Sequence, residues 1–242
     1  MHLEKLQAIV LSSTDYGDSD RIAALFTLEH GRLGGFARGA RNSRKRFGPA
    51  LETFARIDVH LAYKEGLSSL RQADVITVYP GIRSDFNRIS HALYACELVE
   101  CVTPEGHPLP RLYRLLVAYL EHLDLGHEGD ADRRMFEINL LNILGCRPSL
   151  ESCSRCGSKY AENGALMQQG GELVCRFCVA TGRHIAAPVL QSLFSCLSTG
   201  RFGLVQFSAD GLMQAGILLD EVVAAHSGRK LKTLEFLRQI SG

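Results

Sequence analysis

The first eighty residues place apolar and polar side chains in short alternating runs, which predicts strands. In residues 55–61, apolar side chains alternate with Arg56, Asp58 and His60, the period of a strand with one wet face. Four further apolar runs are bounded by turn residues: 6–11, 21–27, 33–37 and 70–78. Five short strands predict a five-stranded β-barrel of the OB type over residues 1–80. An SH3-like barrel or a small sandwich would also fit this pattern.

After residue 80 the apolar spacing changes to the three- and four-residue intervals of helices. Ser84 is suited to cap a helix whose apolar face starts at Phe86 and which ends near Thr103. Pro110 suits the first turn of a second helix, and Asp130 is suited to cap a third. Further helices are expected over 188–197, 210–226 and 231–240. The pattern predicts an α-helical domain over residues 81–242, and so an α+β chain of two domains.

Two Cys-x-x-Cys pairs, separated by 18 residues, form the most specific motif in the chain: Cys153, Cys156, Cys175 and Cys178. Two such pairs around a hairpin, here expected over residues 165–173, are typical of a zinc site with four cysteine ligands. Four thiolates saturate one tetrahedral Zn²⁺ and leave no position for water or substrate. We therefore predict a zinc ribbon inserted at residues 150–182, with one structural zinc ion.

The spacing of the cysteines leaves other interpretations open. An iron site has the same geometry, a single pair can exchange thiols, and two disulfides would suit a secreted protein. The remaining cysteines have no paired spacing and are expected to be small buried apolar side chains. They are Cys96, Cys101, Cys146 and Cys196.

The segment 31–50 carries six cations and no acid: Arg32, Arg38, Arg41, Arg44, Lys45 and Arg46. Its glycines, Asn42 and Pro49 indicate a loop. A solvated charged loop is the ordinary interpretation of a basic run, but six cations without an acid favour contact with phosphates. Phe36 and Phe47 lie beside the cations and could stack on bases. At least Phe36 is expected in the barrel core.

The chain shows no sequence motif of a known catalytic class. A phosphate-binding loop, HExxH, GxSxG and a dinucleotide-binding fingerprint are all missing from the sequence. No apolar run reaches the roughly 18 to 20 residues that span a bilayer. We therefore expect a non-enzymatic protein of the cytoplasm with no membrane partner.

Three stretches together closely resemble the RecO family of bacterial DNA repair and recombination proteins. They are AIVLSSTDYGDSDRIAALFT, EHGRLGGFARGARNS, and the cysteine pairs that follow GCRPSLESC. The resemblance covers nearly the whole chain. It implies a recombination mediator that binds single- and double-stranded DNA, anneals complementary strands, and helps to load RecA onto DNA covered by single-strand-binding protein.

The resemblance also implies partners and sites. RecR is the usual partner, RecF joins in some pathways, and the acidic C-terminal tail of single-strand-binding protein docks on the helical domain. By position, the family's basic loop matches Arg38, Arg41, Arg44, Lys45 and Arg46, and its zinc ligands match the four paired cysteines. An acidic tail that ends in an apolar residue needs an apolar pocket with Arg or Lys at its rim. The candidate rim residues are Arg111, Arg114, Arg133 and Arg134.

Two rival functions fit the residues less well. One is a zinc-stabilised module of transcription or RNA metabolism that contacts nucleic acid or an acidic partner. The other is a metal-dependent nuclease, which would need a cluster of metal-binding carboxylates that the sequence does not show.

Overall fold

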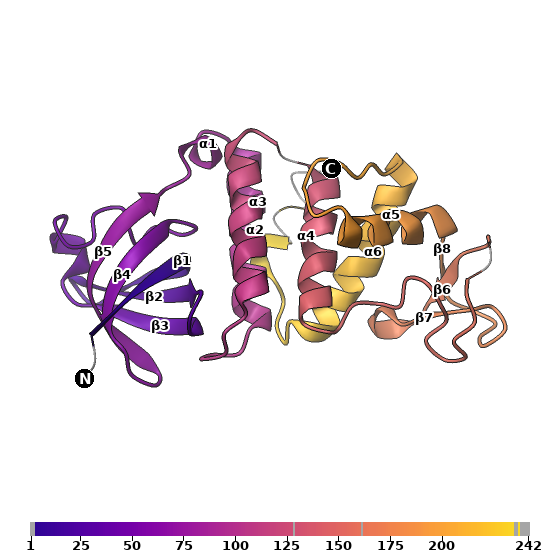
Figure 1. Ribbon diagram of the computed structural model, residues 1–242, viewed down its shortest axis with the longest axis horizontal. Coiled ribbons are helices and arrows are strands. Elements are labelled where there is room, and N and C mark those ends of the chain that lie inside the picture. Colours follow the sequence, from indigo (N-terminus) through magenta and orange to yellow (C-terminus); the bar gives the residue numbers. More distant parts are fainter. Residues whose placement is uncertain (1–2, 128, 161, 235–236, 238–242) are drawn as a thin grey trace. The chain divides into compact units, whose positions relative to one another are not determined.

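The computed structural model describes residues 3–127, 129–160, 162–234 and 237 (Figure 1). Its first elements are β1 (Leu3–Tyr16), β2 (Asp20–Thr27), β3 (Gly31–Ala37), η1 (Ala40–Asn42), β4 (Arg56–Ala62), β5 (Leu67–Thr77), α1 (Pro80–Arg83), α2 (Phe86–Val102) and α3 (Pro110–Asp124). They are followed by α4 (Asp130–Ile143), β6 (Ala165–Met167), η2 (Gln169–Gly171), β7 (Leu173–Val174), β8 (Arg183–Ile185), α5 (Ala187–Ser198) and α6 (Ala209–His226). None of the helices in the described ranges combines the length and the apolar composition that a bilayer span requires.

The five N-terminal strands form a closed barrel in the order β1-β2-β3-β5-β4 (Figure 1). Neighbouring strands are antiparallel except β3 and β5, whose parallel pairing over residues 34–36 closes the barrel. The alternation noted in β4 places Ile57, Val59 and Leu61 in the core, each fully buried. The prediction of an OB-type barrel is confirmed, and closure rules out the two-sheet sandwich.

Strand β1 is longer than the predicted run over residues 6–11. Its first half pairs with β4, and after a register shift between Val10 and Ser12 its second half pairs with β2 as far as Tyr16 opposite Asp20. The polar residues after Leu11 are extended because the ladder with β2 satisfies their backbone groups. Tyr16 pairs with Asp20 at the start of β2, and the next residue, Arg21, pairs with Ala37 at the end of β3. The extension of β1 therefore places Tyr16 at the end of the barrel where β3 ends.

The chain divides into two compact units, residues 1–126 with 231–242, and residues 127–230. Helices α2 and α3 therefore belong to the same unit as the barrel. Glu97 of α2 holds the returning segment, because its carboxylate accepts hydrogen bonds from the backbone N–H groups of Lys232 (3.1 Å) and Thr233 (2.9 Å). Of the helix predicted over 231–240, residues 232–234 and 237 are helical, Leu231 precedes the helix, and residues 235–236 and 238–240 lie outside the described residues.

Two predicted helix starts are wrong by one residue. The side chain that caps α2 is Asp85, which accepts from the backbone N–H of Arg88 at 3.0 Å, while Ser84 donates to the Gly81 carbonyl. Helix α4 is preceded by Gly129, and Asp130 is its first helical residue. Adjacent polar residues offer competing caps, and the sequence alone does not rank them.

The predicted apolar face of α2 is also partly wrong. Phe86 is 58% exposed, whereas Tyr94, Leu98 and Val99 are fully buried. Because α2 contacts both β1 and α3, it buries two sides, and a single stripe of apolar residues describes such a helix poorly.

The second unit consists of helices α4, α5 and α6 with the cysteine ribbon. The ribbon holds a three-stranded sheet in the order β7-β6-β8. Strands β6 and β7 form the predicted hairpin, which turns through Gly170 and Gly171, both with positive φ. Strand β8 was not predicted. It is three residues long and pairs with β6. Hydrogen bonding to β6, and not the local sequence, therefore makes these residues a strand.

Candidate nucleic-acid interface and metal centre

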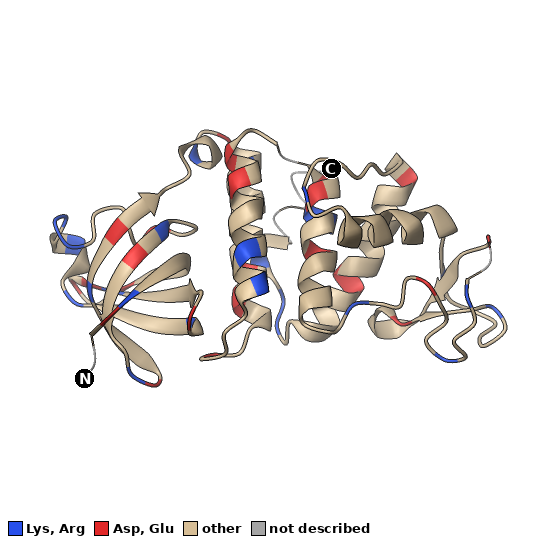
Figure 2. Ribbon diagram, viewed as in Figure 1, with Lys and Arg blue, Asp and Glu red and all other residues tan. Residues whose placement is uncertain are grey.

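The basic loop, defined here as residues 38–46, leaves the end of β3 and is fixed to the barrel at several points. The backbone N–H of Gly39 donates to the Asp20 carboxylate at 2.7 Å, and that of Arg41 donates to the Ser19 carbonyl at 3.0 Å. At the far end, Ala73 donates its N–H to the Arg46 carbonyl at 2.9 Å. The loop is therefore an ordered platform, and Figure 2 shows several Lys and Arg positions, in blue, close together on the ribbon at this end of the barrel.

Three cations of the basic loop are available to a ligand. Arg38, Arg44 and Lys45 are exposed, and among the described residues none of their side chains has a hydrogen bond or an ion pair. A charge of this kind gives up only bulk solvent and counterions when it meets a phosphate.

The other two cations of the basic loop have partners on the protein. Arg41 lies 3.5 Å from the Asp15 carboxylate, which also pairs with Arg21 at 2.9 Å. Arg46 donates to the Ser43 hydroxyl (2.9 Å) and to the Arg38 carbonyl (2.8 Å). These contacts order the loop and lower the net positive charge around Arg41.

Arg32 is separated from this group. It is half-buried in β3, and its Nε donates to the Thr103 carbonyl at 2.9 Å, beside the segment that follows α2. The structure thus brings five of the six predicted cations together and places the sixth against the protein's own backbone.

Of the two candidate stacking side chains, the one expected in the core is the one that lies outside it. Phe47 is 2% exposed and belongs to the barrel core, while Phe36 is half-buried on the outer face of β3. Leu33, Gly35 and Ala37 occupy the inward positions of that strand, so its alternation forces Phe36 outward. The expectation that Phe36 lies in the core was wrong by one register step.

Sequence reasoning missed two residues beside Phe36. Tyr16 is exposed, and its ring lies edge-on to that of Phe36 with centroids 6.0 Å apart. Arg71 is exposed on β5, which runs parallel to β3 with Ser69 opposite Phe36. Arg38 follows directly after the end of β3, and Arg71 lies two residues beyond Ser69, at a register shift of β5 against β4. Only the strand pairing shows this, because the residues are far apart in sequence.

The metal centre is formed by the four paired cysteines, whose sulfur atoms all lie within 4.8 Å of one another. The Cys153 and Cys178 sulfurs are 3.8 Å apart, and those of Cys156 and Cys175 are 3.7 Å apart. Ligands at about 2.3 Å from a tetrahedral zinc ion are separated by about 3.8 Å. All four cysteines are unbonded, so the cluster fits a metal ion and not two disulfides.

Each cysteine pair is shaped by a tight backbone turn. Gly157 has a φ of 73° and donates its N–H to the Cys153 carbonyl at 2.9 Å, and Cys178 donates to the Cys175 carbonyl at 3.0 Å. The N–H of Cys175 donates to the Cys153 sulfur at 3.2 Å. Such turns direct two sulfurs toward one point, which explains why two intervening residues suffice.

The same backbone groups affect the protonation of the cluster. Burial alone would raise the pKa of the Cys153 thiol, but hydrogen bonds from surrounding backbone N–H groups outweigh it and lower this pKa to about 6. Hydrogen bonds with the Cys156 and Cys175 sulfurs raise the pKa of the Cys178 thiol to about 12. Hydrogen bonds from Ser158 also lower the pKa of the Cys156 thiol. Because metal ligands must be deprotonated, a cation that binds the cluster releases the protons that remain on it.

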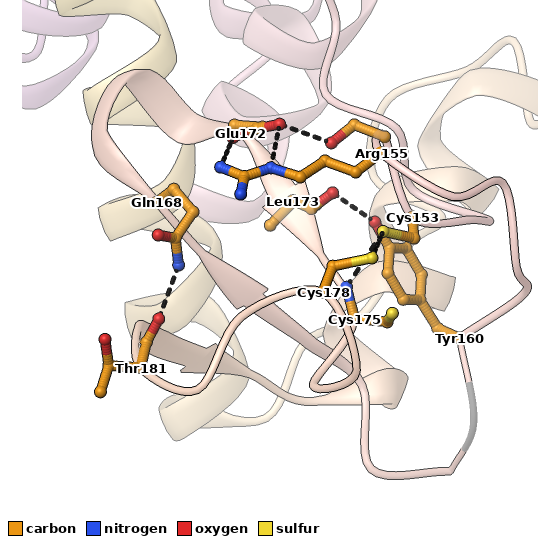
Figure 3. Close-up of polar contacts among 10 residues, drawn as sticks. Cys153, Arg155, Tyr160, Gln168, Glu172, Leu173, Cys175, Cys178 and Thr181 are labelled. Atoms are coloured by element: carbon orange, nitrogen blue, oxygen red, sulfur yellow. Dashed lines mark hydrogen bonds and ion pairs between the residues drawn. The ribbon is translucent and has the colours of Figure 1, made fainter.

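Polar contacts between the loops complete the ribbon, as Figure 3 shows. Arg155 from the first pair forms an ion pair with Glu172 at 2.9 Å, and the Tyr160 hydroxyl lies 2.8 Å from the Leu173 carbonyl. Gln168 donates to the Thr181 carbonyl at 2.8 Å. The apolar cluster around Cys153 and Val174 is small, so the ribbon has little core of its own apart from the sulfurs.

The hairpin turn of the ribbon docks on α6. The N–H of Gly170 donates to the Glu221 carboxylate at 3.0 Å. At Gly171, which has a φ of 78°, a Cβ atom would lie 2.2 Å from a methyl carbon of Val222. Only glycine fits there, and the contact links the cysteine ribbon to the helices of its unit.

The candidate rim arginines for an acidic tail fall into two groups. Arg133 pairs with Asp130 at 2.8 Å, and Arg134 pairs with the fully buried Glu137 at 2.7 Å. Both arginine side chains are buried. Arg111 and Arg114 of α3 are exposed.

The fold and the two sites define a class of protein: an OB-type barrel with a basic loop, joined to a helical unit that carries a four-cysteine ribbon. Family models agree with this description. Residues 1–79 match the N-terminal model of recombination protein O, and residues 83–235 match its C-terminal model.

Relatives of the same kind match along the full chain. The DNA repair protein RecO of Pelobacter propionicus is 61% identical over 242 residues, covering 100% of this chain and 98% of the relative. Those of Geobacter sulfurreducens and Geobacter metallireducens are 50% and 49% identical, covering 100% and 99% of each chain. The chain belongs to the RecO family of DNA repair proteins.

Proposed function

We propose that this chain is a non-enzymatic recombination mediator that binds single- and double-stranded DNA through the basic loop and anneals complementary strands. The observation that carries the proposal is the set of exposed, unpartnered cations at Arg38, Arg44 and Lys45, within the described residues, on an ordered loop beside the Phe36–Tyr16 pair. Arg41, Arg46 and Arg71 add charge to the same surface, whereas Arg32 supports the fold.

The electrostatics of this surface suit a protein that pairs strands without reading their sequence. Each phosphate that meets a cation releases counterions. On single strands, each such contact therefore adds about −0.7 to the slope of log affinity against log salt concentration. Phe36 and Tyr16 can add about 1 to 3 kcal/mol per stacked base, with little preference among bases. Lowering the repulsion between two phosphate backbones accelerates pairing and requires no covalent chemistry.

We further propose that Cys153, Cys156, Cys175 and Cys178 hold one structural zinc ion. Four thiolates complete a tetrahedral shell and leave no site for a substrate. A bound ion would supply the ribbon with the cohesion that its small apolar cluster lacks. The ribbon would then brace α6 through Gly170 and Gly171, so the metal's role is mechanical.

The partner proteins are proposed from the family. RecR is the expected partner, RecF joins in some pathways, RecA receives the DNA, and single-strand-binding protein docks through its acidic tail. Arg111 and Arg114 remain as candidate rims for that tail, because Arg133 and Arg134 already hold carboxylates of the protein. A titration with the tail peptide checks this: undiminished affinity after Arg111→Ala and Arg114→Ala would exclude that surface.

One experiment separates the mediator from the rival functions. Complementary single strands coated with single-strand-binding protein are mixed with the purified chain, without nucleotide or Mg²⁺. The proposal predicts annealing. No annealing would favour a zinc-stabilised interaction module, and strand cleavage in parallel reactions with Mg²⁺ would favour a nuclease.

A further inference from the structure

The tip of the cysteine ribbon carries an aromatic side chain that the metal site does not need. Phe177 lies between the two cysteines of the second pair and is 85% exposed. The Arg176 guanidinium lies 5.3 Å from the centroid of its ring. A ring this exposed contributes little to packing, but beside a cation it is the arrangement with which proteins stack single-stranded bases.

A cavity opens beside this ring. It has a volume of about 480 Å³, and its walls include Lys159, Leu166, Arg176, Phe177 and His184. Leu166 and His184 are directly opposite each other on β6 and β8, so their side chains share one face of the small sheet. The volume lies within the range of small-ligand sites, about 300 to 1,000 Å³. A single nucleobase would fit.

The exposed side chains around the tip include three cations, beside a cysteine cluster whose four thiolates and one Zn²⁺ would together carry a net charge of about −2. Lys159, Arg176 and Arg183 are exposed, and no ion pair is formed by their side chains within the described part of the chain. Arg155 is different, because Glu172 already neutralises it. The cations next to Phe177 are therefore complementary to a phosphate backbone.

We propose that the ribbon tip is a second contact for single-stranded DNA, in which a base stacks on Phe177 and the neighbouring phosphates lie at Arg176 and Lys159. This inference rests on the proposed function, which it deepens by giving the chain one strand site in each of its two units. A protein that anneals must hold two strands, and two separate sites meet that need. An acidic peptide would be attracted to the same cations, but it has no flat base to stack on the ring.

The stacking interaction can be observed directly because the chain contains no tryptophan. Phe177→Trp introduces the only tryptophan, at the tip, and Leu204→Trp, in the same unit, outside the cavity and 62% exposed at present, is the control. Both are made in the full chain carrying Arg38→Ala, Arg44→Ala and Lys45→Ala, with metal content measured. Titration with a thymidine oligonucleotide should quench the fluorophore at position 177 saturably, and leave the control unchanged.

An absence of quenching at position 177 with normal metal content would overturn the inference. So would quenching by an acidic peptide but not by the oligonucleotide. Neither result touches the basic loop, whose contribution is read separately from the affinity lost by the three alanine substitutions in the wild-type background.

A second variant measures the contribution of the ring. In the same background, Phe177→Ala should weaken oligonucleotide binding by about 5- to 100-fold, as expected for the loss of one stacked base, while Phe177→Trp should preserve it. Equal affinity of the two variants would show that the ring does not contact DNA.

Discussion

The basic loop of the barrel and the cysteine ribbon are built in opposite ways. The loop is anchored through its backbone, to Asp20, Ser19 and Ala73, and leaves its charged side chains exposed. The ribbon directs its key side chains inward, since Cys153 and Cys175 are buried and the sulfurs face one another. The charges of the loop can therefore be removed without unfolding it. In the ribbon, by contrast, the side chains that would bind metal are the same ones that hold the fold together.

The largest expected effect comes from removing one sulfur. Cys175→Ser should reduce the metal content from about one ion per chain to nearly none and unfold the ribbon, because structural zinc contributes about 10 to 16 kcal/mol in small peptides. Metal analysis and limited proteolysis of the ribbon measure this. Binding of DNA to the basic loop should persist.

Cys146→Ser is the matched control, since this half-buried cysteine lies outside the cluster. It should retain the metal. If Cys175→Ser left both metal content and protease resistance unchanged, the division of roles between loop and ribbon would be wrong.

The coupling between ribbon and α6 is tested by two adjacent glycines. Gly170 and Gly171 both have positive φ, but a Cβ meets nothing within 4 Å at Gly170 and collides with Val222 at Gly171. Gly170→Ala should therefore cost about 1 to 2 kcal/mol of backbone strain. Gly171→Ala adds overpacking of about 1 to 3 kcal/mol. Thermal unfolding of the two variants checks the difference, and equal stabilities would contradict the docking.

The different positions of Phe36, on the outer face of β3, and Phe47, in the core, give a prediction for the barrel. Phe36→Ala should weaken single-strand binding by about 1 to 3 kcal/mol with a small change in stability. Phe47→Leu, a substitution in the core, should change stability by about 1 kcal/mol and leave binding intact. Fluorescence anisotropy and thermal unfolding distinguish them. The opposite assignment of effects would restore the original expectation for Phe36.

The smallest predicted difference lies within the basic loop itself. Arg44→Ala removes an exposed charge that has no partner among the described residues, whereas Arg41→Ala removes one that Asp15 already partly neutralises at 3.5 Å. Arg44→Ala should therefore reduce DNA affinity more, by a few tenths of a kcal/mol to about 1 kcal/mol. Anisotropy at low salt resolves this. A larger loss from Arg41→Ala would mean that the Asp15 contact opens when DNA binds.

Local patterns predicted much of this molecule. Two intervening residues bring two sulfurs together, so the spacing of the cysteines alone predicted the cluster. The alternation in β4 likewise predicted a strand, because a period of two can be read from a few neighbouring residues.

What the sequence could not predict depends on pairing between distant segments. The polar half of β1 is a strand only because it pairs with β2. In the same way, β8 is a strand only because it pairs with β6. Phe36 lies outside the core, contrary to expectation, because the register of β3 was unknown. Arg32 resembles its neighbours in sequence, yet its strand directs it to the Thr103 carbonyl.

The most direct test of the account is a salt titration of single-strand binding by the full chain and by a variant carrying Arg38→Glu, Arg44→Glu and Lys45→Glu. Arg201→Glu, at an exposed arginine outside both sites, is the control. The variant should bind more weakly, and the slope of log affinity against log salt should flatten by about 2, for three lost phosphate contacts. An unchanged slope, with the control equal to wild type, would contradict the placement of the DNA site on the basic loop.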